Sequence, residues 1–220
     1  MNPHGSRTWT IVCAGGAGHR FGADRAKQYV ELGGRRLIDH AVANALTASD
    51  GVVVCVPADD VDGLAASFAD PRVQVIAGGV LRSDSVRCAL AAVPDDVDVI
   101  VVHDAARPLA PPALFGAVIA AAVNGADAAV PGLVVPDTVK RVKQDVVIET
   151  LDRTELVLVQ TPQAFRAEVL RAAHVGGPDA TDDAALVERA GGTVVVVAGS
   201  PAANKVTTPE DLAAMQRWLV

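Results

Sequence analysis

The chain has 220 residues, of which 50% are hydrophobic, 3% are aromatic and 20% are charged. This length suits one α/β domain with an ample core, and the hydrophobic content excludes intrinsic disorder. The formal net charge of −7 argues against a non-specific nucleic-acid binder and against a polybasic membrane-surface protein, because both need a basic face.

The three cysteines, Cys13, Cys55 and Cys88, are odd in number and never spaced as C-x-x-C. This pattern argues against a disulfide framework and against a structural zinc site, and it favours reduced thiols in a cytoplasmic protein. No secretory signal is recognisable at the start of the sequence. The most apolar stretch, 113–135, is interrupted by polar residues and a proline, so no membrane span is expected.

Short apolar, β-prone runs alternate with amphipathic helical patterns along the chain. The expected strands are 8–13, 52–56, 73–76, 99–102, 128–130 and 193–197. The expected helices are 37–48, 61–68, 83–92, 112–123, 167–174, 184–190 and 209–218. Nearly continuous apolar strands between helices indicate a mostly parallel sheet with helices on both faces. We therefore expect one doubly wound α/β domain that spans 1–220.

The segment 134–159 breaks this rhythm, because it is alternating, β-prone and polar on one face. A turn candidate at Lys143, Gln144 and Asp145 predicts an antiparallel hairpin that projects from the sheet. A lone two-stranded ribbon is marginally stable in water, so a second copy of the chain is the obvious packing partner. An edge hairpin in a monomer fits the pattern equally well.

A glycine-rich turn, AGGAGHRFG, follows the first expected strand. Such a turn is a usual place for phosphates, since backbone amides can approach an anion closely there. Gly16 and Gly18 lack the third glycine of the dinucleotide motif, and the P-loop pattern also fails. Arg20 and Lys27 add two cations, which suits a polyphosphate. A surface loop with solvated charges remains the alternative at this point.

Further polar clusters follow later strands. They lie at 78–85, 103–108, 161–163, 181–183 and 204–207. Each alone could be a turn or a helix cap. Together they favour a ligand site beyond the carboxyl ends of the strands. No acyl-transfer triad, nucleophile elbow or metal-ligand spacing is present, so no covalent intermediate is expected.

Taken in order, these motifs resemble the 2-C-methyl-D-erythritol 4-phosphate cytidylyltransferase family. The pieces that carry the resemblance are AGGAGHRFG, KQY, GGVLRSDSV, VVHDAARP, DTVKR, LDR, QTPQAF, TDDA and KVTTPEDL. The resemblance covers about 11–212. It implies a Rossmann-like domain whose β-arm at 134–159 exchanges with a partner in a homodimer. It also implies transfer of CMP from CTP to methylerythritol phosphate with release of pyrophosphate, and Mg²⁺ or another divalent cation held mainly by the CTP phosphates.

The resemblance further implies roles for individual residues. The implied catalytic residues are Arg20, Lys27, Lys205 and, from the neighbouring subunit, Arg153. The implied nucleotide-binding residues are Ala14, Gly15, Gly16, Gly18, Gly79, Ser85, Asp104 and Ala105. The implied substrate-binding residues are Asp104, Arg107, Thr138, Arg153, Thr161, Thr181 and Lys205. No protein ligand for a metal is implied.

Two positions depart from the family pattern. Cys13 stands where the family usually has proline, with an extra glycine after Ala14. Because backbone donors are what matter in this loop, we expect function to survive the change. Ala203 stands where the family often has asparagine, which puts a polar contact at this position in question.

Three other functions fit parts of the pattern. A ribitol 5-phosphate cytidylyltransferase would share the nucleotide half and differ near Thr138, Arg153 and Thr181. A non-catalytic nucleotide-binding module would not need Arg20, Lys27 and Lys205 around the α-phosphate. A dinucleotide oxidoreductase is disfavoured by the glycine spacing.

Overall fold

The structure is a computed structural model that describes residues 5–15, 26–177 and 179–219. Its strands are β1 (Thr8–Cys13), β2 (Glu31–Leu32), β3 (Arg35–Arg36), β4 (Gly51–Val56), β5 (Val73–Ala77), β6 (Val99–Asp104), β7 (Ala128–Val134), β8 (Lys140–Lys143), β9 (Val146–Thr150), β10 (Val157–Val159), β11 (Gln163–Arg166) and β12 (Val194–Ala198). Its α-helices are α1 (Leu37–Leu46), α2 (Val61–Ala65), α3 (Arg82–Leu90), α4 (Pro112–Val123), α5 (Ala167–Ala173), α6 (Asp183–Arg189) and α7 (Pro209–Met215).

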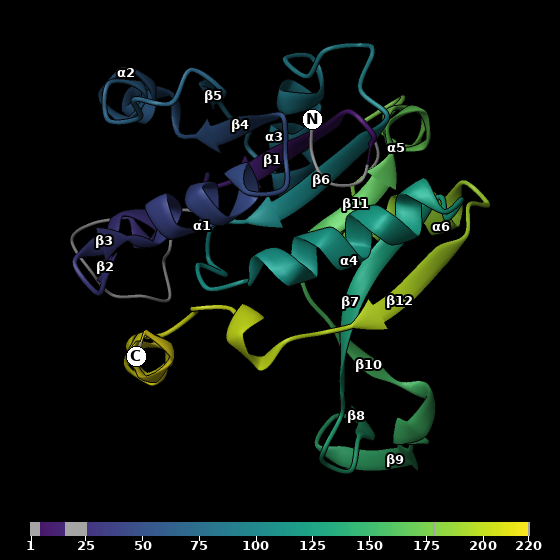
Figure 1. The fold of residues 1–220 in the computed structure, drawn as a ribbon. Helices are drawn as coiled ribbons and strands as arrows, with labels where there is room; N and C mark the ends of the chain where they lie inside the picture. Colours follow the sequence, from purple (N-terminus) through teal and green to yellow (C-terminus); the bar gives the residue numbers. More distant parts are fainter. Residues whose placement is uncertain (1–4, 16–25, 178, 220) are drawn as a thin grey trace.

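The central sheet has the order β10-β7-β11-β6-β1-β4-β5, and β12 pairs with β7 (Figure 1). The pairs β6–β1, β1–β4, β4–β5 and β7–β12 are parallel. β11 is antiparallel to both β6 and β7, and β10 is antiparallel to β7. The predicted mostly parallel sheet is therefore confirmed.

Helices cover both faces of the sheet, as predicted. On one face α1 and α4 pack on alternate strand residues such as Val12 and Val54. On the other face α3, α5 and α6 pack on the intervening residues, such as Ile11 and Val53. Because successive side chains of a strand point to opposite faces, strands buried on both faces must be apolar throughout. This explains the continuous Val and Ile runs in β4 and β6.

The predicted elements agree with the structure to within a few residues, but four short strands were not predicted. β2 and β3 form a small separate hairpin, and β10 pairs with the end of β7. β11 matters most, because its backbone lies between β6 and β7. It brings the connection that contains Gln160 and Thr161 beside the end of β6, where Thr161 contacts Asp104.

The predicted arm is present and stands away from the sheet (Figure 1). β8 pairs with β9 in antiparallel fashion, and Gln144 and Asp145 form the turn between them with φ of 48° and 63°. Positive φ at both central residues is the conformation of a tight hairpin turn. The side chains of Val142, Val146 and Ile148 are more than half exposed, at 53%, 63% and 55%. The arm therefore presents apolar surface that the described part of this chain leaves uncovered.

The register of the parallel strands aligns the loops that follow them. Cys13 of β1 pairs with Cys55 of β4 and with Asp104 of β6. The glycine-rich turn after β1 and the polar turn after β6 therefore start at the same level. Within the described ranges, no helix has both the length and the apolar content needed to cross a bilayer.

Candidate active site

Two cavities lie at the carboxyl edge of the parallel strands. The first, about 160 Å³, is lined by Cys13, Ala14, Gly15, Lys27, Gln28, Gly79, Val80, Leu81, Arg82, Ser85, Asp104, Ala105, Ala106 and Lys205. The second, about 180 Å³, is lined by Arg82, Asp104, Arg107, Val159, Gln160, Thr161, Gln163, Thr181, Asp182 and Lys205. Arg82, Asp104 and Lys205 line both cavities, so their side chains form a shared wall between them.

A larger cavity of about 710 Å³ lies elsewhere, at the other end of β6 beside Asp98 and Val99. None of the predicted site residues that the structure describes lines it. Ligands of open α/β sheets bind beyond the carboxyl ends of the strands. We therefore assign the site to the two smaller cavities at that edge.

In the first cavity, the turn between β5 and α3 forms part of the wall through Gly79, Val80 and Leu81. The Gly79 amide donates to Ser85 Oγ at 3.1 Å, and the Ser85 hydroxyl approaches the Leu81 carbonyl at 3.1 Å. A Cβ at Gly79 would lie 2.2 Å from Asp84 Cβ, which is closer than two carbons without a bond between them can approach. Glycine is required here so that the turn can lie against the start of α3.

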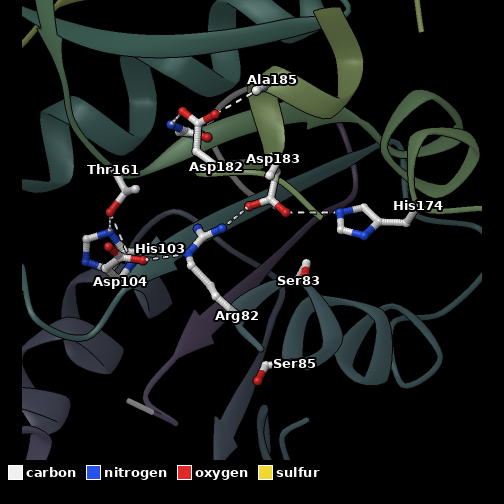
Figure 2. A network of polar contacts seen from close by, with 12 residues as sticks. Arg82, Ser83, Ser85, His103, Asp104, Thr161, His174, Asp182, Asp183 and Ala185 are labelled. Atoms are coloured by element: carbon white, nitrogen blue, oxygen red, sulfur yellow. Dashed lines mark hydrogen bonds and ion pairs between the residues drawn. The ribbon is translucent and has the colours of Figure 1, made fainter. Parts of the chain in front are cut away.

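Asp104 is the centre of the shared wall. Its Oδ1 accepts from Arg82 Nε at 3.1 Å (Figure 2). Its Oδ2 accepts from Lys205 Nζ at 2.6 Å. Burial alone would raise the pKa of this carboxyl, but the charges of Arg82 and Lys205 outweigh that effect and hold the pKa well below its usual range. Asp104 is therefore an anion whenever the two cations are in place.

The backbone of Asp104 is fixed by a second set of contacts. Its amide donates to Thr161 Oγ1 at 3.0 Å, and Thr161 Oγ1 lies 3.1 Å from His103 Nδ1. A hydroxyl oxygen has one proton and two lone pairs, so Thr161 can donate to Nδ1 or accept from it, according to which ring nitrogen carries the proton. Burial lowers the pKa of His103 to about 4, which agrees with a neutral ring. The Thr161 hydroxyl therefore serves to hold Asp104.

Arg107 is held by main-chain carbonyls. Its Nη1 donates to the Ala203 carbonyl at 2.8 Å, and its Nη2 donates to the Val159 carbonyl at 3.4 Å. The residue at position 203 thus takes part in a polar contact through its backbone carbonyl. At the other departure, burial raises the pKa of the Cys13 thiol well above its ordinary value, so this side chain adds no negative charge to the first cavity.

Most of the predicted residues meet at this edge. Lys27 and Lys205 line the first cavity, and Arg107, Thr161 and Thr181 line the second. The predicted residues Gly16, Gly18 and Arg20 lie outside the described residues. Two predictions do not converge within this chain: the two residues on the arm, Thr138 and Arg153, line neither cavity. Arg153 donates instead to the Pro136 carbonyl of the same arm.

The sequence interpretation missed Arg82 and Asp183. Arg82 is the first residue of α3, and its Nη1 donates to Asp183 Oδ2 at 2.6 Å (Figure 2). A cation in the first turn of a helix opposes the helix dipole. That unfavourable placement was the available signal that Arg82 must be paired with carboxylates.

The described residues around Asp104 offer few side-chain ligands to a divalent cation. In the part of the chain that the structure describes, no group of three His, Cys, Asp or Glu side chains could hold a metal ion. Both carboxylate oxygens of Asp104 already accept from cations. The residues present therefore suit a metal ion that enters with the oxygens of its own ligand, as a nucleotide triphosphate provides.

A mostly parallel sheet with a glycine-rich turn after β1, and with lysines lining two adjoining cavities, is typical of a nucleotide-dependent transferase. The sequence model of the 2-C-methyl-D-erythritol 4-phosphate cytidylyltransferase family matches residues 8–220. This chain belongs to that family and is a cytidylyltransferase.

Individual relatives agree with this assignment. The protein of that name from Nocardia farcinica is 47% identical over 206 residues, which cover 92% of this chain and 89% of the relative. The protein of that name from Saccharopolyspora erythraea is 46% identical, with 92% and 95% covered. The solved structure from Thermus thermophilus, of the same name, has a TM-score of 0.79 at 31% identity, with 96% and 98% covered. A solved 4-diphosphocytidyl-2C-methyl-D-erythritol synthase from Anaerococcus prevotii has a TM-score of 0.84 at 26% identity, with 98% and 99% covered.

The predicted family, Rossmann-like fold class and enzyme class are thus confirmed. The ribitol 5-phosphate alternative and the non-catalytic module are not favoured by these relatives.

The neutral state of His103 predicts a pH dependence of stability. Its folded-state pKa of about 4 lies below the ordinary 6.5, so the unfolded chain binds the extra proton between these values. The contribution of the neutral His103 to the free energy of unfolding is therefore fully present above pH 6.5. It is lost as the pH falls towards 4, with a slope of up to about 1.4 kcal/mol per pH unit.

The comparison of wild type with His103→Asn measures this slope, because the asparagine amide can donate to Thr161 or accept from it but does not titrate. We expect urea unfolding from pH 7 to pH 4 to show a shallower loss of unfolding free energy in the variant. Parallel curves for the two proteins would show that His103 does not contribute to acid destabilisation.

Proposed function

We propose that this chain binds CTP in the first cavity and 2-C-methyl-D-erythritol 4-phosphate in the second, and joins them with release of pyrophosphate. The observation that carries this assignment is the shared wall of Arg82, Asp104 and Lys205. A transfer reaction requires two ligands to meet at one boundary. Lys205 lies at that boundary, where the phosphate of one ligand can face the α-phosphorus of the other.

The proposed step is an in-line attack by an acceptor phosphate oxygen on the α-phosphorus of CTP. Such transfers need alignment and charge neutralisation rather than covalent help from the protein. Lys27 faces the nucleotide cavity, Arg107 faces the acceptor cavity, and Lys205 faces both. Although the whole chain carries −7, the local field at this edge decides whether two anions can approach. Arg20 belongs to the same proposal by family resemblance.

The remaining parts of the proposal concern the nucleotide. Ala14 and Gly15 border the triphosphate, Gly79 and Ser85 recognise the cytidine, and Asp104 and Ala105 lie along the ribose. All six residues line the first cavity, which supports this division. Mg²⁺ is proposed to arrive bound to the CTP phosphates and to offset part of their charge.

The arm supports a proposal of homodimerisation. Its exposed apolar side chains have no cover within the described part of this chain, and a two-stranded ribbon gains stability by packing on a partner. Thr138 and Arg153 lie on the arm and line neither cavity of their own chain. We propose that each arm carries these two residues to the acceptor cavity of the partner subunit.

Two further expectations complete the proposal. We propose that 1–220 acts as one nucleotidyltransferase domain with 134–159 as its dimerisation arm. We also propose a cytoplasmic location, because CTP and the sugar phosphate are charged metabolites and because Cys13, Cys55 and Cys88 are all unpaired with one another.

The direct test is a pyrophosphate-release assay with CTP and each of two sugar phosphates. We expect turnover with 2-C-methyl-D-erythritol 4-phosphate and at least about a hundredfold lower kcat/KM with ribitol 5-phosphate, because a polar site rejects a wrongly placed hydroxyl pattern. Equal turnover of both would contradict the acceptor assignment. Absence of turnover with either would contradict the function.

Lys27→Ala should lower turnover strongly. Loss of one preorganised donor to developing charge costs about 2.7–4 kcal/mol, or roughly 10²–10³ in kcat. Steady-state kinetics measure the loss, and circular dichroism checks that the fold is intact. Arg72→Ala is the control, because Arg72 pairs with Asp70 at an exposed turn and lines neither cavity. A Lys27→Ala enzyme with kcat near the wild-type value would remove Lys27 from the mechanism.

Subunit mixing tests whether Arg153 acts in the partner's site. Arg153→Ala and Lys27→Ala proteins should each be nearly inactive alone. Mixed and re-equilibrated, they should recover about a quarter of the wild-type rate, because half of randomly assorted dimers contain one intact site. Mass spectrometry of the mixture verifies that heterodimers form. Heterodimers without recovered activity would rule out an exchanged arm.

A further inference from the structure

Arg82 joins two carboxylates from distant parts of the chain (Figure 2). Its Nε donates to Asp104 at the end of β6 at 3.1 Å, and its Nη1 donates to Asp183 at the start of α6 at 2.6 Å. A planar guanidinium holds its donors in a fixed fork, so it can orient two carboxylates at once. Lysine, with its single compact charge, cannot hold both in this geometry.

The contacts of Arg82 with Asp104 and Asp183, called the bridge below, connect the shared wall to one edge of the acceptor cavity. Asp104 lines both cavities, whereas Thr181 and Asp182 line only the second. Asp183 follows them directly, so an ion pair at Asp183 fixes the turn 181–183. Arg82 therefore ties the side of the acceptor cavity formed by this turn to the side formed by Asp104.

The Asp183 end of the bridge is buried and has a second hydrogen-bond partner. Asp183 is 1% exposed, and its Oδ1 accepts from His174 Nε2 at 3.0 Å. His174 follows α5 directly, and both α5 and α6 pack in the same apolar core. A buried carboxylate that loses its cation is strongly unfavourable, so Arg82 and Asp183 must stay together for the turn to keep its place.

The Asp104 end of the bridge sets the position of the Lys205 ammonium. Asp104 divides its two oxygens between Arg82 and Lys205. If Arg82 were absent, the Asp104 carboxylate could turn wholly towards Lys205 and draw its ammonium away from the acceptor phosphate. The side chain of Arg82 is only 28% exposed and directs two of its donors at these carboxylates. Although Arg82 also lines both cavities, these two contacts place its charge against Asp104 and Asp183.

We propose that Arg82 is a positioning residue for the acceptor: by joining Asp104 to Asp183 it sets the width of the acceptor cavity and the direction of Lys205. This role rests on the proposed transfer function. It predicts a defect on the acceptor side that exceeds any defect on the CTP side.

Two variants test the bridge. Arg82→Lys keeps the charge but can reach only one carboxylate, and Asp183→Asn keeps the side-chain shape but removes the charge that Arg82 pairs with. Pyrophosphate release is measured with CTP and 2-C-methyl-D-erythritol 4-phosphate varied separately. We expect Arg82→Lys to raise KM for the acceptor at least about tenfold while KM for CTP changes less than about threefold. Asp183→Asn should give the same pattern to a smaller extent.

Arg171→Lys is the matched control. Arg171 is a partly buried arginine that donates to the carbonyls of Leu90, Val93 and Pro94 and lines neither of the two site cavities. A purely structural defect reduces the amount of folded enzyme and hence the apparent kcat, but it leaves both KM values unchanged. This is the result expected of Arg171→Lys.

The outcomes separate the inference from the function. Unchanged KM for the acceptor in folded Arg82→Lys, or a rise confined to KM for CTP, would overturn the positioning role. If Arg82→Lys does not fold, Asp183→Asn decides, and unchanged acceptor KM in that variant overturns the role. Wild-type enzyme without turnover would overturn the proposed function itself.

Discussion

The site depends on one carboxylate that would be costly to bury without partners. Asp104 ends a β6 strand that is buried along its whole length, and it remains charged because Arg82 and Lys205 each donate to one of its oxygens. Its backbone is fixed independently through Thr161 and the neutral His103 ring. With its carboxylate and its amide both constrained, Asp104 can act as a rigid boundary between two ligands that repel each other.

Much of the fold was predictable from the sequence. Strands buried on both faces must be apolar along their length, and that constraint makes β1, β4 and β6 recognisable from their residues alone. β11 was not predicted because it has only four residues and carries the buried polar side chain of Gln163. Its place in the sheet comes from backbone pairing with β6 and β7, which leaves no periodic pattern of side chains.

The residues of the candidate site also fall into those that the sequence predicted and those that it did not. Glycine turns and lone lysines are local features, so Gly79, Lys27 and Lys205 could be recognised within short motifs. Arg82 could not be assigned, because its partners are 22 and 101 residues away along the chain. Long-range ion pairs leave no spacing signal. Thr161 was expected to contact the acceptor, and it lines the second cavity. Its hydroxyl also contacts Asp104 and His103, and only three-dimensional proximity reveals that role.

The contact between Arg107 and the carbonyl of residue 203 bears on how such sequences diverge. A main-chain acceptor is supplied by every amino acid, so this hydrogen bond does not depend on which side chain stands at position 203. What the position does restrict is volume, because Ala203 has no accessible surface. A motif can therefore lose a polar side chain at this place while the hydrogen bond that orients Arg107 persists.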